Sequence, residues 1–295
     1  MPVEEVKITP RLVCALIAEQ RPDLAHLPVE ALANGWDNAM FRLGSHHTVR
    51  LPRRAVAVPL IEHEQRWLSR LANELALPLP IPAPLHIGRP NEEYPWSWSI
   101  CPWLKGTTAE GSSFDATRVA TQLGEFLAAL HKSAPADAPS NPFRGVPLHE
   151  RDATLRARIS GISMFIDVEP TLVLWDKLCA TSPSVGPPVW LHGDLHPANL
   201  LVDGGQLSAV IDFGDITSGD RATDLAVAWM LLPPEAQPVF REAAGNVDDD
   251  TWTRARGWAL ALSIAYMAGS ADNPMIFAIG KRTWESVMTS AATGR

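Results

Sequence analysis

The chain has 295 residues, of which 46% are hydrophobic and 20% charged, a composition that can bury a large core in one or two domains. Its formal charge of −8 at pH 7 argues against a nucleic-acid-binding protein, which would carry a basic stripe, and mildly favours a cationic ligand. The three cysteines, Cys14, Cys101 and Cys179, lie far apart and are odd in number, so they predict neither a disulfide framework nor a zinc site.

The first hundred residues predict a mixture of helices and strands. Thr9-Pro10 has the form of a helix N-cap followed by proline, and the apolar residues after it repeat with helical spacing. Residues 34–54 predict two strands joined by a short Ser-His-His turn, and Ile61–Leu75 returns to a helical pattern. A proline-rich stretch then blocks helix formation, and the aromatic segment Trp96–Trp103 predicts a further strand.

After Gly106 the pattern is mainly helical. Apolar residues at helical spacing predict a helix over Ala116–His131, a proline-rich loop follows, and residues 154–181 predict one or two helices. An Asp-Gly-Gly turn joins the last two of three predicted short strands, Val189–Leu191, Leu200–Val202 and Leu207–Ile211. Helical patterns fill the rest of the chain, at roughly 222–232, 234–244, 250–269 and 273–289.

Together these elements predict an α+β protein of two lobes. The N-lobe, residues 1–103, is small and contains an antiparallel sheet, whereas the C-lobe, residues 104–295, is larger and mainly helical. The acidic N-terminus, MPVEEVKITP, lacks the apolar core of a signal peptide. The longest apolar stretch, Trp258–Gly269, is shorter than the about 20 residues that cross a bilayer. We therefore expect a cytoplasmic protein without a membrane partner.

Two short motifs carry the chemistry that the sequence predicts. In HGDLHPANLL, residues 192–201, four residues separate Asp194 from Asn199, and the following VIDFGD places Asp212 at the end of the next predicted strand. Phosphoryl transfer needs a carboxylate beside the attacking hydroxyl and oxygen ligands for Mg²⁺. Protein kinases use the same spacing, D-x-x-x-x-N followed by D-F-G.

Two other readings of these motifs exist. Each aspartate alone would be explained by a turn or a helix cap, but three correctly spaced groups require that coincidence three times. The pattern H-x-D-x-H, formed by His192, Asp194 and His196, would suit a metallohydrolase. Zinc would need a further ligand cluster, and the remaining histidines form no convincing pair.

His192-Gly193-Asp194, with Asp212 downstream, resembles the aminoglycoside-phosphotransferase and choline-kinase family. The resemblance covers nearly the whole chain and implies a bilobal, protein kinase-like fold that phosphorylates small-molecule hydroxyls. It implies that Asp194 is the catalytic base and that Asn199 and Asp212 are the metal ligands. A second segment, Gly219–Ala226, is similar to the family's G-D-x-x-x-D-L-A, whose two aspartates are structural.

A kinase also needs a cation over the nucleotide phosphates and an acid that fixes the cation. The candidates are Arg50, on the second strand of the hairpin, and Glu64, with Glu62 as the competing partner. The family usually has lysine at the place of Arg50, but arginine stays charged and grips phosphate with two donors. Further arginines lie nearby, at positions 42, 53 and 54.

The segment from Ser99 to Leu104 resembles the hinge between the two lobes of this family, where backbone groups form hydrogen bonds with adenine. By that resemblance Pro102 presents its carbonyl oxygen, Leu104 donates its backbone N–H, and Cys101 faces the base as a small apolar neighbour. The implied cofactor is Mg²⁺ with ATP, and GTP remains an alternative.

The acceptor is expected to bind the helical segments of the C-lobe, roughly residues 132–185 and 233–290. Asp215 is a candidate for the acceptor side, and the acidic run at 248–250 fits either an amino sugar or the N-terminus of a helix. Tryptophans and Tyr266 in this region suit a sugar pocket or helix packing equally.

The leading hypothesis is an ATP- or GTP-dependent O-phosphotransferase that acts on a hydroxylated small molecule. Fold resemblance alone does not choose between an antibiotic acceptor and a metabolic alcohol or sugar of the choline or homoserine type. A nucleotide-binding pseudokinase is the second class, which Arg50 favours. A protein kinase is disfavoured because no segment ending in A-P-E follows Asp212.

Overall fold

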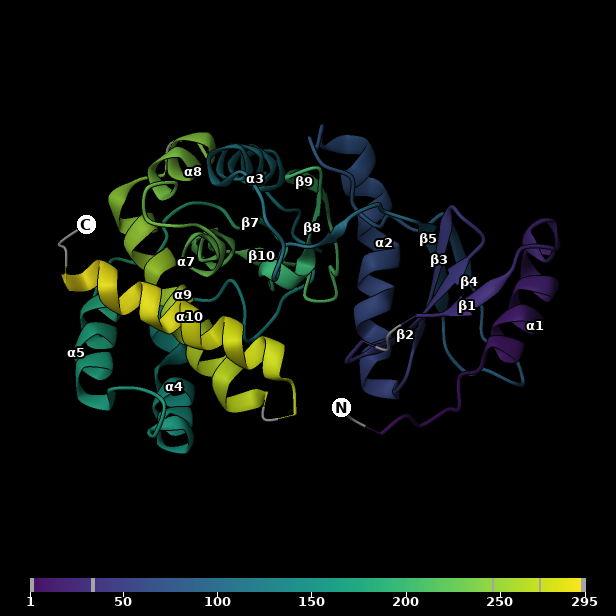
Figure 1. Cartoon of the computed structure of the whole chain (residues 1–295), viewed down its shortest axis with the longest axis horizontal. Coiled ribbons are helices and arrows are strands. Elements are labelled where there is room, and N and C mark those ends of the chain that lie inside the picture. Colours follow the sequence, from purple (N-terminus) through teal and green to yellow (C-terminus); the bar gives the residue numbers. More distant parts are fainter. Residues whose placement is uncertain (1–2, 33–34, 246, 271, 293–295) are drawn as a thin grey trace. The chain divides into compact units, whose positions relative to one another are not determined.

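The computed structural model describes residues 3–32, 35–245, 247–270 and 272–292, and the chain divides into two structural units (Figure 1). The first unit comprises Met1–Ala76, Pro80–Lys105 and Ala209–Gly214, and the second comprises Leu77–Leu79, Gly106–Ser208 and Asp215–Arg295. The chain changes units after Lys105, close to the position at which the sequence pattern turns helical. Asp212 belongs to the first unit although it lies far along the chain from the N-terminal sheet.

The first unit is built on an antiparallel sheet of five strands in the order β1-β2-β3-β5-β4. The strands are β1 (Val29–Ala31), β2 (Asn38–Leu43), β3 (His47–Pro52), β4 (His86–Gly88) and β5 (Trp98–Pro102). In β3, Arg50 stands opposite Met40 of β2 on one side and Ser99 of β5 on the other. This central strand has neighbours on both sides, which fixes the register of Arg50.

Two helices accompany this sheet, α1 (Pro10–Gln20) and α2 (Val58–Glu74). The Thr9 hydroxyl accepts the Leu12 backbone N–H at 3.3 Å, as predicted for an N-cap. The apolar face of α1 then joins the buried core that β2, β3 and β5 also supply. Gln65 of α2 donates its amide to the backbone oxygen of Trp98 at 3.1 Å and to the Ser99 hydroxyl at 3.0 Å. These bonds tie α2 to the strand beside Arg50.

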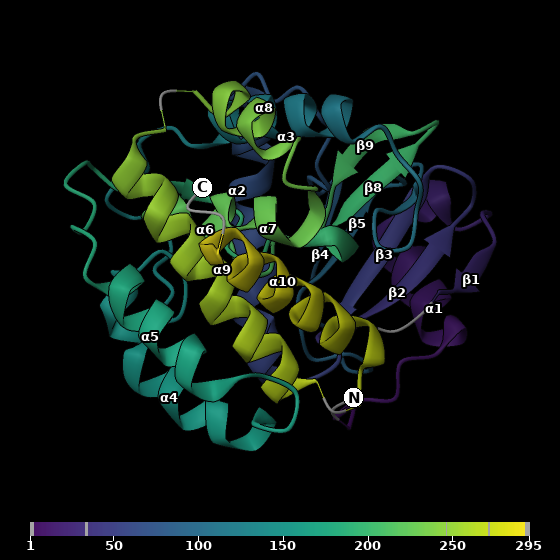
Figure 2. The same cartoon turned by 60° about the vertical axis from the view of Figure 1, so that its left-hand side comes forward.

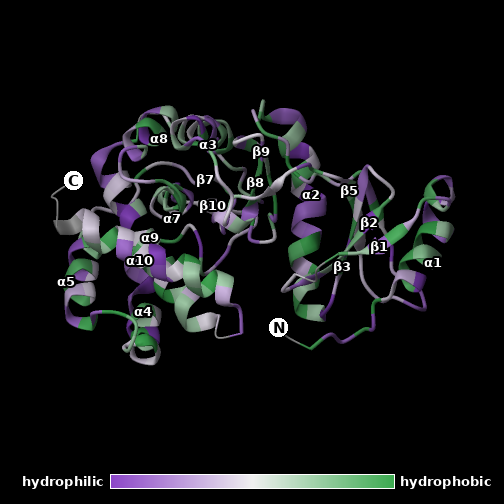
Figure 3. Ribbon diagram, in the orientation of Figure 1, coloured by the Kyte–Doolittle hydropathy of each residue, from purple (hydrophilic) through white to green (hydrophobic). Residues whose placement is uncertain are grey.

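The second unit is mainly helical and is arranged around the long helix α9 (Asp249–Gly269) (Figure 2). The helices packed against α9 are α4 (Asp152–Ile159), α5 (Val168–Cys179), α6 (Ala222–Leu225), α7 (Val227–Leu231) and α10 (Pro274–Ala292). A second packed pair is α3 (Ala116–Leu130) with α8 (Gln237–Ala243). Hydrophobic and hydrophilic residues both occur along α2 and α3, as expected of helices that bury one face (Figure 3).

Two small sheets complete this part of the chain. β7 (Val189–Leu191) pairs antiparallel with β10 (Thr217–Gly219), and β6 (Thr107–Thr108), β8 (Leu200–Asp203) and β9 (Gln206–Val210) follow one another in a three-stranded sheet. The predicted strands β7, β8 and β9 are therefore present. No helix in the described ranges combines the length and apolar character needed to cross a membrane.

The structure differs from the sequence prediction in several places. β1, β4, β6 and β10 were not predicted, because two or three residues are too few to show an alternating pattern. The helix predicted over residues 222–232 is divided into α6 and α7 at Ala226. The prediction that Asp212 ends a strand was wrong: β9 ends at Val210, and Asp212 has a left-handed backbone with φ 63°. Aspartate tolerates that conformation better than most residues, which permits the sharp turn.

The packing of α3 on α8 yields a prediction for Gly124. A Cβ atom there would lie 2.6 Å from the Ala243 Cβ and 2.7 Å from the Phe240 backbone oxygen. We expect Gly124→Ala to lower the free energy of unfolding by about 1–3 kcal/mol through overpacking. This loss would exceed the about 1 kcal/mol that alanine gains over glycine in a helix. Urea unfolding of the variant and the wild-type protein measures this change in the free energy of unfolding.

Gly269→Ala is the matched control for this substitution. A Cβ at Gly269, the last residue of α9, would meet no atom within 4 Å among the described residues. The control should leave stability unchanged or slightly raised. Equal effects of the two substitutions would contradict the close packing of α3 and α8.

Candidate active site

The loop between β7 and β8 carries Asp194 and Asn199, and buried groups fix its backbone. The Asp224 carboxylate, fully buried on α6, accepts the backbone N–H of His192 at 2.8 Å and that of Gly193 at 2.9 Å. Gly193 has φ 88°, and a Cβ there would lie 2.2 Å from the backbone oxygen of Asp215. The loop therefore needs glycine at this position. These bonds agree with the structural role that the resemblance implies for Asp224.

Asp220, the other aspartate of that motif, is part of a buried ion pair. Its carboxylate receives the Arg254 guanidinium of α9 at 2.6 Å and 3.3 Å, and it accepts the backbone N–H of Ala222 at 3.1 Å. This pair joins the start of α6 to α9. Both aspartates of the motif thus act on the framework around the loop.

Three side chains surround the Asp194 carboxylate within the second unit. The Tyr266 hydroxyl of α9 donates to Asp194 Oδ1 at 2.9 Å, and an Arg144 Nη atom lies 3.1 Å from the same oxygen. His196 Nε2 is 3.6 Å from Oδ2. Burial disfavours ionisation of Asp194, but the neighbouring His196 ring, the Arg144 charge and the Tyr266 hydroxyl outweigh it and hold its pKa well below the usual range. The group is an ionised carboxylate in a fixed orientation.

Asn199 stands in η5 (Pro197–Asn199) and is oriented by the same loop. Its Nδ2 donates to the backbone oxygen of Asp194 at 2.9 Å, so its amide oxygen is left as an acceptor with no hydrogen bond from the described residues. An amide oxygen is one of the ligands that Mg²⁺ accepts in proteins. Asn199 therefore fits the predicted role of metal ligand.

The two histidines of H-x-D-x-H are occupied within the loop. His192 Nδ1 accepts the Asp194 backbone N–H and His196 Nδ1 accepts the Ala198 backbone N–H, both at 3.2 Å. The described ranges contain no group of three or more His, Cys, Asp or Glu side chains placed to hold a metal ion. These hydrogen bonds give both histidines a structural role in the loop, so no zinc site is needed to explain them.

A second cluster, in the first unit, is centred on Arg50, whose side chain is buried. Its Nη1 lies 2.8 Å and 2.7 Å from the two carboxylate oxygens of Glu64, and its Nη2 lies 3.7 Å from Asp212 Oδ1. Burial opposes the charge of Arg50, but Glu64 and Asp212 outweigh it and raise its pKa. Glu62 is exposed. The ion pair considered in the sequence is therefore formed with Glu64.

Asp212 and its neighbours connect the Arg50 cluster to the D-F-G segment. The Phe213 backbone N–H bonds to Glu64, and the Asp212 side chain is 59% exposed. A carboxylate that is both exposed and beside a fixed guanidinium has free oxygen for a metal ion. Asp212 thus also fits a ligand for Mg²⁺.

The other arginines of this region have partners of their own. Arg54 pairs with Asp37 at 3.0 Å, and Arg53 donates to the backbone oxygen of Gly35. Arg42 lies over the Trp103 ring at 3.9 Å from its centroid. Among these four arginines, Arg50 is the one that contacts both Glu64 and Asp212.

The predicted hinge residues lie at the end of β5 and after it. Cys101 is buried, and this burial raises the pKa of its thiol to about 12, so it is a neutral, apolar neighbour. Pro102 and Leu104 are half-buried. The Trp103 backbone N–H between them donates to the His46 backbone oxygen at 2.8 Å. The roles of Cys101, Pro102 and Leu104 toward adenine remain predictions.

Arg144 and the bond from Tyr266 were not found from the sequence. Arg144 lies in the proline-rich loop 50 positions from Asp194, and Tyr266 lies 72 positions away. No local pattern links residues at such separations. Asp215, the predicted acceptor-side residue, accepts the Asn141 amide at 2.7 Å, which ties the same loop to the site.

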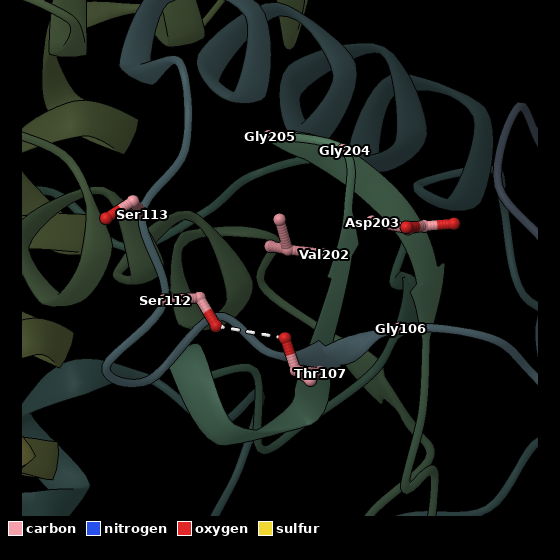
Figure 4. Close-up of a pocket in the computed structure, with 8 residues that line it drawn as sticks. All are labelled: Gly106, Thr107, Ser112, Ser113, Val202, Asp203, Gly204 and Gly205. Atoms are coloured by element: carbon pink, nitrogen blue, oxygen red, sulfur yellow. Dashed lines mark hydrogen bonds between the residues drawn. The ribbon is translucent and has the colours of Figure 1, made fainter.

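A polar hollow of about 300 Å³ lies elsewhere in the second unit, along β6 and the β8–β9 turn (Figure 4). The Thr107 and Ser112 hydroxyls that line it bond to each other at 3.1 Å. None of the predicted site residues lines this hollow. We assign it no role in the chemistry.

The family model of the phosphotransferase enzyme family matches residues 28–258, a range that contains both clusters except for Tyr266. The chain belongs to this family. Among curated relatives, an aminoglycoside 3'-phosphotransferase of Escherichia coli is 27% identical over 161 residues, which cover 52% of this chain and 58% of the relative. One of Streptomyces fradiae is 28% identical over 173 residues, covering 55% and 63%. The chain thus matches less than two thirds of the length of these relatives.

Solved structures of related enzymes have the same fold. The GDP complex of wild-type aminoglycoside 2'-phosphotransferase-IIIa has a TM-score of 0.72 at 18% identity, covering 96% of this chain and 100% of that one. A macrolide 2'-phosphotransferase from Brachybacterium faecium has a TM-score of 0.63 at 20% identity, covering 92% and 97%. The predicted α+β, protein kinase-like fold is confirmed.

The Arg50–Glu64 pair yields a prediction for stability. Glu64→Gln would leave the buried Arg50 charge with only the more distant Asp212, and breaking a buried ion pair costs roughly 3–5 kcal/mol. We expect a loss near the lower end of that range in chemical unfolding. Glu62→Gln, on an exposed residue of the same helix, should change stability by no more than about 0.5 kcal/mol. Equal effects at the two positions would refute the assignment of Glu64 as the partner.

Proposed function

We propose that this protein transfers the γ-phosphoryl group of ATP or GTP to a hydroxyl group of a small molecule, in the cytoplasm. The observation that carries the proposal is the Asp194 carboxylate, which Tyr266 and Arg144 hold ionised in a loop that also orients Asn199. Family membership supports the proposal. Solved structures of relatives contain GDP in one enzyme and ADP in another, so both nucleotides belong in the test.

In this proposal Asp194 is the catalytic base. Its carboxylate accepts the hydrogen bond of the acceptor hydroxyl and aims the oxygen at the γ-phosphorus. The new P–O bond forms as the bond to the β,γ-bridging oxygen breaks, the nucleoside diphosphate leaves, and the hydroxyl proton passes to Asp194. Asp194 thus orients the acceptor hydroxyl and receives its proton.

The remaining residues bind the nucleotide. Arg50, fixed by Glu64, would hold the phosphates, and the segment of Cys101, Pro102 and Leu104 would read the base. Asn199 and Asp212 would hold Mg²⁺, whose charge offsets that of the phosphates. Arginine replaces the family's usual lysine, yet its pairing with a glutamate is retained. This retention favours a working enzyme over a pseudokinase.

Asp194→Asn tests the base. We expect kcat to fall by about 100- to 10,000-fold, the range typical of a lost general base, while nucleotide affinity is kept. Phosphoryl transfer with an acceptor panel and slow hydrolysis of ATP and GTP measure the effect. Asp203→Asn, in the exposed β8–β9 turn, is the control and should retain full turnover. Near wild-type turnover of Asp194→Asn would refute the role of Asp194, and nucleotide binding without turnover in the wild type would indicate a pseudokinase.

Asp212→Asn tests the metal ligand while keeping a residue that tolerates the left-handed backbone at φ 63°. We expect nucleotide affinity in the presence of Mg²⁺ to fall at least as much as the roughly 10–100-fold seen when partners of metal ligands are changed. Affinity measured in EDTA should match that of the wild type. An unchanged Mg²⁺ dependence would exclude Asp212 as a ligand.

A further inference from the structure

A narrow recess in the second unit is lined by three arginines and no acidic side chain. Arg144 comes from the proline-rich loop, Arg151 from η3 (Leu148–Arg151) and Arg158 from α4, whereas α9 contributes Trp258 and smaller apolar residues. The interior, of about 10 Å³, has room for about one water molecule. A larger ligand group would therefore bind at the opening of the recess. We call Arg144, Arg151 and Arg158 the arginine cluster.

Arg151 is the least explained member of the cluster. It is only 7% exposed, yet its guanidinium has no hydrogen bond or ion pair within the described residues, and its nearest ring contact is Phe143 at 5.3 Å. Burial and the charges of Arg144 and Arg158 lower its pKa, and together they outweigh the opposing charge of Glu150. The donors of Arg151 are therefore available to a ligand, and an anion at the opening of the recess would bind them through charge-assisted hydrogen bonds.

The other two arginines also have unused capacity. Arg158 is exposed and forms no ion pair in the described part of the chain, so its guanidinium can turn toward a ligand. Its spacing of seven from Arg151 places the two on one helical face. Arg144 bonds Asp194 through one nitrogen, while its buried Nε has no partner. The cluster therefore begins at the proposed catalytic base and extends away from it.

Two of the three aspartates at 248–250, the acidic run considered for a cationic acceptor, have structural partners. Asp248 caps α9, where it accepts the Thr251 backbone N–H and hydroxyl, both at 2.7 Å. Asp249 pairs with Arg241 at 2.6 Å. The nearby Trp252 packs against Trp229, with 4.7 Å between ring centroids. These contacts give Asp248, Asp249 and Trp252 structural roles at the start of α9.

We infer that the acceptor carries an anionic group, a carboxylate or a phosphate, which the arginine cluster binds while a hydroxyl of the same molecule lies at Asp194. Guanidinium groups match both anions with paired donors. The inference rests on the proposed phosphotransferase function. It names a substrate class opposite in charge to the aminoglycosides named for the curated relatives.

The test uses acceptors matched except for charge. Glycerate is compared with glycerol, and gluconate and glucose 6-phosphate with glucose and glucosamine, each with ATP and with GTP. We expect the anionic member of at least one set to have a kcat/KM roughly 10-fold or more above its neutral counterpart, as for one charged hydrogen bond. Comparison of the carboxylate-bearing acceptors with the phosphate-bearing acceptor identifies which anion the arginine cluster binds.

Arg151→Met should lower kcat/KM for the anionic acceptor by roughly 10–100-fold and leave the neutral one unchanged. Arg151→Lys should restore part of the loss, which a purely structural role would not predict. Arg158→Met, on an exposed residue that tolerates change, repeats the test if Arg151→Met does not fold. Arg118→Met, exposed on α3, is the control for the loss of one positive charge and should have no effect.

A preference for neutral or cationic acceptors, or an Arg151→Met variant that affects all acceptors equally, would overturn the inference and leave the proposed function intact. If no acceptor turns over with either nucleotide, the proposed function fails by itself. Calorimetric titration with sulfate, glycerate and glycerol then decides the anion site. Saturable binding of the anions alone, weakened in Arg151→Met and Arg158→Met, supports it, and no binding overturns it.

Discussion

The buried carboxylate of Asp224 is the contact on which the loop between β7 and β8 depends. It accepts two consecutive backbone N–H groups, from His192 and Gly193, and the His131 ring nitrogen lies 3.2 Å from it. A buried carboxylate without such donors would cost several kcal/mol, so the loop and α6 stabilise each other. A side chain at Gly193 would collide with the backbone of Asp215, so the loop needs glycine immediately before Asp194. Main-chain bonds thus place Asp194, and Tyr266 and Arg144 orient its side chain.

The sequence predicted the parts of the site that depend on local spacing. Asp194, Asn199 and Asp212 share one loop and the hairpin after it, so a short motif identifies them. The choice of Glu64 over Glu62 depends on which residue α2 buries, and this required the packed structure. Arg144 and Tyr266 reach Asp194 from 50 and 72 positions away, through tertiary packing that leaves no periodic signal. Strands as short as β6 and β10 are also set by their partners, because their own residues show too little pattern.

Net charge and local charge point in opposite directions in this protein. A formal charge of −8 favours a cationic ligand, yet the recess beside Asp194 is lined by arginines and by no carboxylate. Total charge averages over a surface, whereas recognition depends on the few groups that face a ligand within a Debye length or less. Several acidic side chains have structural roles elsewhere, in helix caps such as Asp248 and in ion pairs such as Asp220 with Arg254.

The arginine at position 50 determines whether this side chain can react with acylating reagents. A lysine in such a place can lose its proton and attack an acylating nucleotide analogue, because its pKa falls readily on burial. Arg50 has its pKa raised by Glu64 and Asp212 and is never deprotonated in water, so it has no nucleophilic form. Reagents that label kinases by acylating this lysine would leave position 50 unmodified. A ligand that contacts Arg50 would therefore do so reversibly, through the paired donors of its guanidinium.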